Sequence, residues 1–168
     1  MSGHVLRLSV KPRTPGEHGL PKQAVSELRV TRAGATGDHN NYRTRTLGGD
    51  PDQAILLLTD EALRSLDAEG WPVRPGDLGE NITLGGVPEA DLRPGVRLAL
   101  GEVLLEVTHR CDPCTELYSL PSIGAARGPE FLRVAVDRRG WYARVLAEGV
   151  IRPDTPVRLL QPSGAGAS

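Results

Sequence analysis

The sequence predicts a mostly β fold, namely a β-barrel or barrel-like sheet with a few short helices. Two observations lead to this prediction. Short runs of apolar residues alternate with polar ones at a period of two, which is the pattern of half-buried strands. Gly and Pro turn signals separate these runs about every 8 to 12 residues, as in sandwiches and barrels. We expect one domain over residues 1–162 and a mobile tail of small residues over 163–168.

The first half of the chain predicts four strands and one helix. The strands are expected at residues 4–10, 25–30, 53–58 and 81–84. The third strand is a compact apolar run, QAILLL, that suits the centre of a sheet. A helix should follow it over residues 60–69, with Thr59 or Asp60 as its N-cap. Gly70 can then end that helix.

The second half predicts a hairpin, another helix and further strands. Residues 96–100 and 102–107 form the hairpin, and Gly101 supplies its turn. A helix is expected from Pro129 to Arg138, because proline is favoured in the first turn of a helix. Two more strands are expected, at 141–146 and 156–160.

The composition argues against nucleic-acid and membrane partners. The chain has 168 residues and a net charge of -1, so no basic surplus predicts binding to nucleic acid or to an anionic membrane. It has no apolar run of about 18 residues and no signal-peptide pattern, so we expect a cytoplasmic protein. In that reducing compartment the two cysteines are expected as thiols or thiolates and not as a disulfide.

Both cysteines follow the clearest strand signal of the chain. The run EVLLEVTHRCDPC alternates regularly and then reaches Cys111 and Cys114. Pro113 cannot continue the hydrogen bonds of a strand, so Cys114 is expected in a loop mouth just beyond the strand end. Loop mouths are where reactive side chains are commonly presented.

The cysteine pair leaves several kinds of site open. Each thiol could be a small, buried apolar side chain. The pair could supply half of a structural zinc site, completed by His109 or His39. A thioredoxin-like site would place CxxC at a helix N-terminus, and a zinc deaminase would need an HxE motif, so both fit poorly. A reactive thiol is the remaining interpretation.

The two lysines form a second candidate feature. The 20 basic residues include only Lys11 and Lys22 as lysines, which leaves 20 − 2 = 18 arginines. These two lysines flank a loop rich in Gly and Pro, and they predict either point charges for a phosphate or two solvated side chains. The polar stretch 35–51 is a candidate binding loop or an ordinary exposed connection.

Five motifs in a fixed order carry a resemblance to a known family. They are GLPKQAV at 19–25, GATGDH at 34–39, PGDLGENIT at 75–83, THRCDPC at 108–114 and RGWYARVLAEG at 139–149. With them, residues 4–161 resemble a stand-alone MOSC domain, named for the C-terminal region of molybdenum cofactor sulfurases. The resemblance implies a β-barrel-like MOSC fold and binding of the molybdenum cofactor, Mo-molybdopterin.

The resemblance also implies roles for individual residues. Cys114 matches the family cysteine that ligates the metal or carries sulfur, which makes it the catalytic candidate. Lys11 matches a lysine that contacts the pterin phosphate, and Asn81 matches an asparagine of the cofactor pocket. Further cofactor contacts are expected from Lys22, Asp38, His39, Arg43, Thr108 and Cys111.

Two positions depart from the family pattern. Relatives often read GDRH where this chain has Gly37, Asp38, His39 and Asn40, so their arginine falls at His39, and Arg43 or Arg45 is expected to replace it against the cofactor phosphate. Relatives also often carry an arginine where this chain has Cys111. Asp38 can equally be an aspartate that caps a turn.

The resemblance implies an oxidoreductase that reduces N-hydroxylated compounds, such as hydroxylamino bases or amidoximes, with Cys114 on the molybdenum. Two cysteines cannot hold an iron–sulfur cluster, so the electrons are expected from external donor proteins. One alternative is a binding module that carries sulfur as a Cys114 persulfide, or delivers the cofactor, without turnover. Another is a structural β-domain whose cysteine pair is inert.

Overall fold

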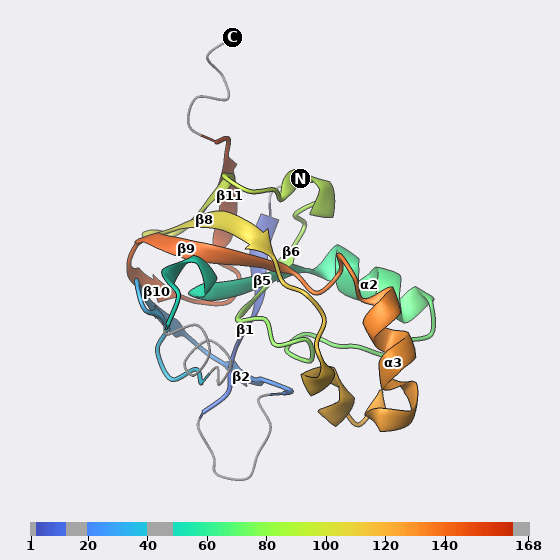
Figure 1. Cartoon of the computed structure of the whole chain (residues 1–168). Helices are drawn as coiled ribbons and strands as arrows, with labels where there is room; N and C mark the ends of the chain where they lie inside the picture. Colours follow the sequence, from blue (N-terminus) through green and yellow to red (C-terminus); the bar gives the residue numbers. More distant parts are fainter. Residues whose placement is uncertain (1–2, 13–19, 40–48, 163–168) are drawn as a thin grey trace.

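The structure is a computed structural model that describes residues 3–12, 20–39 and 49–162 (Figure 1). Seven strands form a closed β-barrel, so the predicted mostly β, barrel-like fold is confirmed. Around the barrel the order is β1 (Gly3–Val10), β6 (Ile82–Gly85), β5 (Ile55–Thr59), β9 (Trp141–Ala147), β8 (Val103–Arg110), β7 (Arg97–Leu100) and β11 (Pro156–Leu160). The tail predicted at 163–168 lies outside the described residues.

The barrel closes where its first and last strands meet. β11 pairs with β1 in antiparallel register, with Gly3 opposite Val157 and His4 opposite Pro156. The other neighbours are antiparallel too, except β5 and β6, which run parallel. Parallel strands cannot be joined by a tight turn, so the chain between β5 and β6 must cross over, and helix α2 lies in that crossover.

Helix α2 (Asp60–Ala68) confirms the predicted cap and apolar face. The Thr59 hydroxyl accepts a hydrogen bond from the Ala62 amide, 3.1 Å away. Ala62, Leu63 and Leu66 are buried in an apolar cluster separate from the barrel core. Gly70 follows with a φ of 92°, a conformation that favours glycine.

The same cluster attaches a second helix to the side of the barrel. Helix α3 (Gly124–Val134) buries Phe131, whose ring lies 5.0 Å from the ring of Trp71. The 3-10 helix η3 (Thr115–Ser119) adds Leu117 to the cluster. Figure 1 shows α2 and α3 together at one side of the barrel. The chain that follows the two cysteines therefore passes from the barrel to the helical side.

The bounds predicted for α3 are wrong. The helix begins at Gly124, so Pro129 lies inside it instead of in its first turn. An internal proline lacks the N–H that would bond the carbonyl one turn earlier. Packing holds the segment helical all the same, because Phe131 is fully buried and Gly128 lies so close to the Tyr118 ring that a Cβ would collide with it.

The single strand predicted at 25–30 is in fact two strands in different sheets. β2 (Gln23–Val25) pairs with β1, with Val25 opposite Leu8. After a bend, β3 (Leu28–Thr31) pairs with β10 (Gly149–Ile151) and with β4 (Gly34–Ala35) in a small three-stranded sheet. A period of two cannot show that the chain changes sheets, because both short strands keep it.

Strand β8 carries the chain toward the cysteines as predicted. Val103, Leu105 and Val107 are buried in the barrel core, and Gly101 forms the turn from β7 with a φ of 62°. The strand ends at Arg110, before Pro113 is reached. Cys114 therefore lies in the connection between β8 and η3. Within the described residues, no helix is long and apolar enough to cross a membrane.

Gly140→Ala is expected to destabilise the protein by about 3 kcal/mol. Gly140 has a φ of 105°, and a Cβ there would collide with the Leu57 carbonyl oxygen, so backbone strain and overpacking both contribute. Urea unfolding measures the change. Gly70→Ala is the matched control, because its φ is 92° but nothing lies within 4 Å of a Cβ; about 1 kcal/mol is expected there. Equal losses would contradict the collision.

Candidate functional site

A cavity of about 550 Å³ opens beside the end of β8 and the start of β9. Residues 112–116 form one wall, and Tyr142 of β9 and Leu56 of β5 contribute to others. Lys22 and His39, from the N-terminal part of the chain, also line it. The volume is within the range of small-molecule and cofactor sites, which is about 300–1,000 Å³.

Cys114 lies on this cavity wall in contact with a buried guanidinium. Its side chain is exposed, and its Sγ accepts a hydrogen bond from Nη1 of Arg139 at 3.0 Å. Arg139 is only 6% exposed. The same Nη1 donates to the Asp112 carbonyl at 3.1 Å, and Nε donates to the Leu78 carbonyl at 3.2 Å. Arg139 thus connects its own segment with Leu78 and with residues 112–114 around the sulfur. A cation in contact with sulfur stabilises negative charge on the sulfur.

Arg139 owes its place to the pairing of β8 with β9. The Cys111 amide donates to the Gly140 carbonyl at 2.9 Å, which extends the ladder past the end of β8. Gly140 allows the close approach of this turn to β5, as its contact with Leu57 shows. The residue before it, Arg139, is thereby directed behind the segment that carries Cys114.

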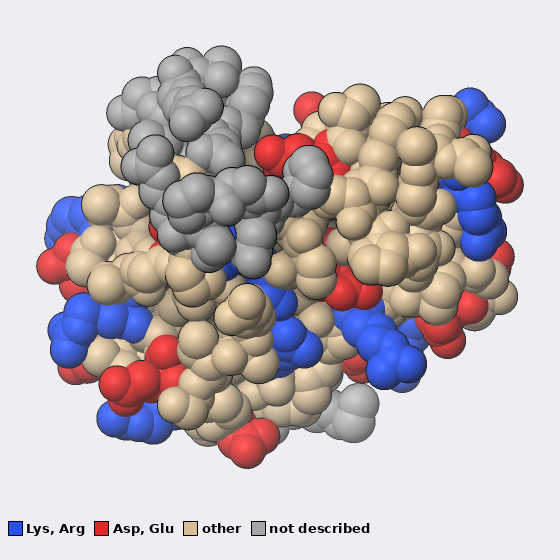
Figure 2. Space-filling model, turned by 90° about the horizontal axis from the view of Figure 1, so that it is seen from below, with Lys and Arg blue, Asp and Glu red and all other residues tan. Residues whose placement is uncertain are grey.

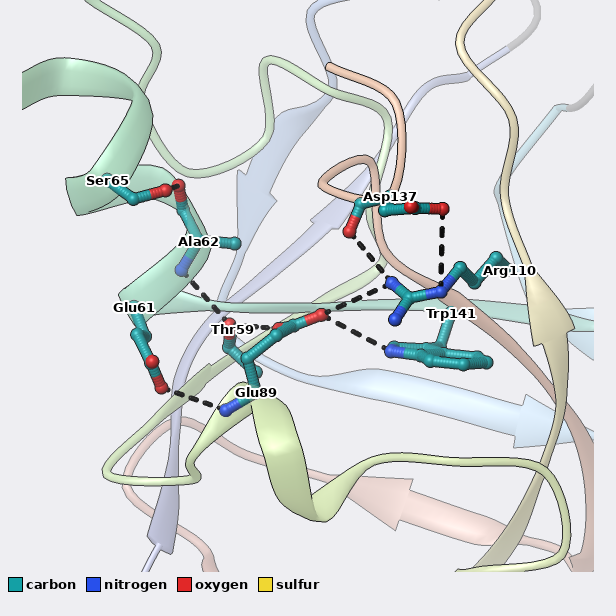
Figure 3. A network of polar contacts seen from close by, with 8 residues as sticks. All are labelled: Thr59, Glu61, Ala62, Ser65, Glu89, Arg110, Asp137 and Trp141. Atoms are coloured by element: carbon teal, nitrogen blue, oxygen red, sulfur yellow. Dashed lines mark hydrogen bonds and ion pairs between the residues drawn. The ribbon is translucent and has the colours of Figure 1, made fainter. Parts of the chain in front are cut away.

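A polar network holds the turn that carries Arg139 from the side of Trp141 and Asp137 (Figure 3). Glu89, in the 3-10 helix η2 (Glu89–Asp91), accepts hydrogen bonds from the Thr59 hydroxyl at 2.6 Å and from Nε1 of Trp141 at 3.3 Å. The Arg110 guanidinium lies 3.9 Å from the Glu89 carboxylate and donates to the Asp137 carbonyl at 2.8 Å. It also stacks over the Trp141 ring, 4.2 Å from the ring centroid. The network ties α2, the end of β8 and the turn before Arg139 together.

Cys111 has a different environment from Cys114. It is buried, and its thiol donates to the Tyr142 hydroxyl at 3.3 Å. Burial raises the pKa of the Cys111 thiol and also that of the Tyr142 phenol, so both groups are neutral at pH 7. Cys111 does not line the cavity. The two thiols are therefore not equivalent, and only Cys114 is presented to a ligand.

The described residues do not form the ligand set that the zinc alternative would need. Across 3–12, 20–39 and 49–162 no three His, Cys, Asp or Glu side chains gather in a group that could hold a metal ion. His39 and His109 both line the cavity with Cys114. A structural zinc site normally needs four protein ligands in a tetrahedron.

Asp38 is the centre of a second, buried cluster beside the cavity. Its Oδ2 lies 2.7 Å from Nζ of Lys22 and accepts a hydrogen bond from Nδ2 of Asn81 at 2.9 Å. Its Oδ1 accepts from the Lys11 backbone amide at 2.9 Å. The His39 amide in turn donates to the Lys11 carbonyl at 2.8 Å. The aspartate therefore fixes Lys22 and attaches the loop that ends at His39 to the end of β1.

Asn81 joins this cluster to two strands. Its Oδ1 accepts from the Leu56 amide at 3.0 Å, and its Nδ2 donates to the Ser9 carbonyl at 3.3 Å as well as to Asp38. Both amide hydrogens and the carbonyl are thus used inside the protein. Asn81 and Asp38 line a small hollow of about 70 Å³ that shares Lys22 and Tyr142 with the large cavity.

The residues singled out from the sequence fall into three groups. Lys22, His39 and Cys114 line the large cavity, while Asp38 and Asn81 line the small one. Three others line neither of these cavities: Lys11, Thr108 and Cys111. The Thr108 hydroxyl donates to the Asp52 carbonyl at 2.6 Å. Arg43 lies outside the described residues, as do Asn40 and Arg45.

The residues of the site that sequence reasoning missed include Arg139 and Gln53. Arg139 opens the motif RGWYARVLAEG, so its place in the motif was visible, but its burial was not. Gln53 lines both cavities although it was assigned to a strand. It instead ends the 3-10 helix η1 (Pro51–Gln53), which Asp50 caps.

Charges of both signs are interspersed on the face seen from below, around the described part of the molecule (Figure 2). Among the described residues, the charges on that face do not gather into a surface of one sign. Around the cavity itself, Arg110 and Arg139 are accompanied by Asp112 and Glu116.

Comparisons with known proteins identify a family and several similar proteins. A family model described as the MOSC domain matches residues 44–158. Protein YiiM of Escherichia coli (strain K12) is 26% identical over 143 residues, which are 82% of this chain but only 61% of that relative's length. A YiiM structure from Geobacillus stearothermophilus is 27% identical, with a TM-score of 0.72 over 98% of this chain and 78% of that one. The YuaD protein of Bacillus subtilis is similar in fold, with a TM-score of 0.75 at 17% identity over 95% of this chain and 96% of that one.

Iodoacetamide is expected to label one cysteine in the native protein and two after denaturation. Cys114 is exposed at the cavity, whereas Cys111 is 3% exposed. Intact mass spectrometry counts the adducts. The Cys114→Ser protein serves as the control and should remain unlabelled while folded. Rapid native labelling of that variant would contradict the burial of Cys111.

Asp38→Asn is expected to destabilise the protein by about 3–5 kcal/mol, because it leaves a buried ammonium without its counter-ion. The Lys22 and Asp38 side chains are 7% and 10% exposed. Urea unfolding measures the loss. Glu27→Gln is the matched control, since Glu27 forms an exposed pair with Arg152 at 3.1 Å and about 0–1 kcal/mol is expected there. Similar small losses in both variants would show that the Asp38 cluster does not stabilise the fold.

Proposed function

Because the chain belongs to the MOSC domain family, we propose that it binds the molybdenum cofactor, with the Cys114 sulfur as the metal ligand in the cavity. The observation that carries the proposal is the contact between an exposed Cys114 and a buried Arg139 on the wall of a cavity large enough for a pterin. The E. coli relative is longer than this chain, so no activity of that whole protein is transferred directly.

The chemistry of the available donor atoms fits this cofactor. Thiolate is a soft ligand, and a single exposed sulfur leaves the remaining positions of a metal to other ligands. The Arg139 guanidinium stays protonated in proteins, so it can stabilise the negative charge of the sulfur before and after metal binding. Cys111 and Tyr142 are neutral and hydrogen-bonded to each other, so they add no competing charge.

The shape of the cavity wall also fits a close-lying ligand. Gly79 lines the cavity with a φ of 89°, and a Cβ there would approach a Leu20 methyl group to 2.9 Å. Glycine therefore lets the Leu20 side chain pack directly against the backbone at this point. A flat pterin ring can lie against such a surface of backbone and apolar side chains.

Lys22 is the candidate contact for the cofactor phosphate. Asp38 holds its ammonium at 2.7 Å and so fixes its direction. An ammonium has three N–H donors, of which one serves Asp38, so others can donate to a phosphate. The pairing with Asp38 also reduces the net positive charge at this point, which favours a weakly charged phosphate ester over free polyphosphates.

As the function we propose the reduction of N-hydroxylated compounds. When bound, the cofactor would supply two-electron redox chemistry. The protein would hold the metal through Cys114, orient the flat cofactor and admit a small polar substrate past residues 112–116. Electrons would come from donor proteins, since the chain has only two cysteines and cannot form an iron–sulfur cluster of its own.

The second candidate function is that of a sulfur carrier. It is favoured by the same exposed Cys114, since the Arg139 guanidinium could equally stabilise the terminal sulfur of a persulfide. The two functions differ in what the purified protein contains. Bound molybdenum with pterin fluorescence supports the reductase, and cyanide-releasable sulfur without metal supports the carrier.

Cys114→Ser is expected to abolish molybdenum retention while leaving the melting temperature nearly unchanged. A hydroxyl is a poor soft-metal ligand, and an exposed thiol contributes little packing. Metal analysis by mass spectrometry, on protein from a host that makes molybdopterin and from one that does not, measures retention. Cys111→Ser is the comparison, and its metal affinity should fall by about 10- to 100-fold, as is typical for groups that support a ligand. Equal molybdenum content in Cys114→Ser and the parent protein would refute the assignment.

A further inference from the structure

His109 faces the cavity next to the proposed metal ligand and has no role in the binding described so far. It is the second-last residue of β8, its side chain is exposed, and it lines the cavity that Cys114 also lines. Its ring packs against the Tyr142 ring, with centroids 5.2 Å apart. Its Nε2 lies 3.0 Å from Nε2 of Gln53. The ring is therefore held from two sides.

The 3-10 helix that ends at Gln53 is attached to the strand that carries His109. The Thr108 hydroxyl donates to the Asp52 carbonyl at 2.6 Å, which attaches η1 to β8 one residue before His109. The Asp50 carboxylate accepts from the Asp52 amide at 2.9 Å and caps η1. Arg144 of β9 lies 3.3 Å from the Asp52 carboxylate. These contacts place the end of η1, and with it Gln53, beside His109.

The contact with Gln53 links the tautomer of the ring to the orientation of the carboxamide. With the Gln53 nitrogen toward the ring, Nε2 of His109 accepts and the neutral ring carries its hydrogen on Nδ1. Nδ1 has no hydrogen-bond partner among the described residues. A ring that lines the cavity and keeps its N–H unpaired can donate to a ligand bound there.

The carboxamide of Gln53 can also accommodate the protonated ring. Its Oε1 is buried and has no hydrogen-bond partner within the described residues. If the carboxamide rotates by half a turn, Oε1 faces Nε2 and accepts its hydrogen, so an imidazolium is stabilised too. The amide can therefore face Nε2 either as donor or as acceptor without any movement of the ring.

We infer that His109 donates the proton to the departing hydroxyl group when an N-hydroxylated compound is reduced in this cavity, an inference that rests on the proposed function. Two electrons from a flavin or iron–sulfur donor protein and two protons convert the N–OH group of the substrate to N–H and release water. The N–O bond breaks, one proton from His109 leaves with the oxygen as water, and one proton from solvent forms the new N–H bond. Without an acid the leaving group would be hydroxide, which departs poorly.

His39 also lines the cavity, whereas four other polar groups there are less suited to this task. Arg110 and Arg139 do not release protons in proteins. Burial raises the pKa of Tyr142, whose hydroxyl already accepts from Cys111. Lys22 is paired with Asp38. Histidine is the side chain that exchanges a proton near neutral pH.

The first test needs no cofactor. Nitrogen-15 NMR of the full chain with labelled histidine is expected to show His109 as the Nδ1–H tautomer at a pH where the ring is neutral, with the signal assigned by its loss in His109→Gln. Gln53→Leu removes the donor and should lower the Nδ1–H fraction. A parent protein with the proton on Nε2, unaffected by Gln53→Leu, would overturn the inference.

The second test uses protein loaded with molybdenum, benzamidoxime as substrate and reduced methyl viologen as the electron source. His109→Gln is expected to lower kcat by about 100-fold with little change in KM and with unchanged metal content. In His109→Gly, added imidazole should restore much of the rate. His4→Gln is the control and should match the parent, because His4 lies on β1 away from the cavity.

The outcomes separate the two proposals. A parent protein that carries molybdenum and reduces benzamidoxime while His109→Gln does so equally fast would overturn the role of His109 alone. A parent protein without molybdenum or without turnover would overturn the proposed function and this inference together. Loss of rate in His109→Gly without rescue by imidazole, at normal metal content, would also count against proton donation and indicate a steric role.

Discussion

The burial of one guanidinium, that of Arg139, constrains the whole candidate site. A buried charge is costly unless it is paired and hydrogen-bonded, and Arg139 meets this need with the carbonyls of Leu78 and Asp112 and with the sulfur of Cys114. Those partners come from two segments, one at Leu78 and one at residues 112–114, which are far apart in the chain. The requirement to satisfy the guanidinium therefore brings the segments together, and the two carbonyls bear only partial charge. The sulfur is the partner that faces the cavity, so the guanidinium that joins these segments also lies against the candidate metal ligand.

Much of the fold was predictable because strands carry their burial pattern in the sequence. The alternation of Val103, Leu105 and Val107 and the cap at Thr59 were both read correctly, since each depends on neighbours within a few residues. The errors arise where distant parts of the chain determine the local secondary structure. Residues 25–30 divide between two sheets because β1 and β10 offer separate partners. Pro129 lies inside α3 because the packing of Gly128 and Phe131 outweighs the missing backbone hydrogen bond.

The candidate site was predictable only in part. Cys114 could be singled out because it is one of two cysteines and follows a strand into a proline-containing loop. Arg139 could not, because it is one of 18 arginines and nothing in its neighbours signals that it is buried. Asn81 shows a related difficulty. Its motif marks it, but its amide proves to be fully used in joining Leu56, Ser9 and Asp38. A motif marks a position as important, but the hydrogen-bond partners of that residue are known only from the folded chain.

The closure of the barrel affects how the chain folds during its synthesis. The seam joins residues 3–4 to residues 156–157, so a ribosome must make nearly all of this chain before the first strand meets its last neighbour. Until then two strand edges are free to pair with other chains. Strands β5, β9 and β8, which border the cavity, lie on the opposite side of the barrel order from the seam and pair with one another. The cavity wall can therefore be assembled before the seam closes, and it can survive when the ends of the chain fray.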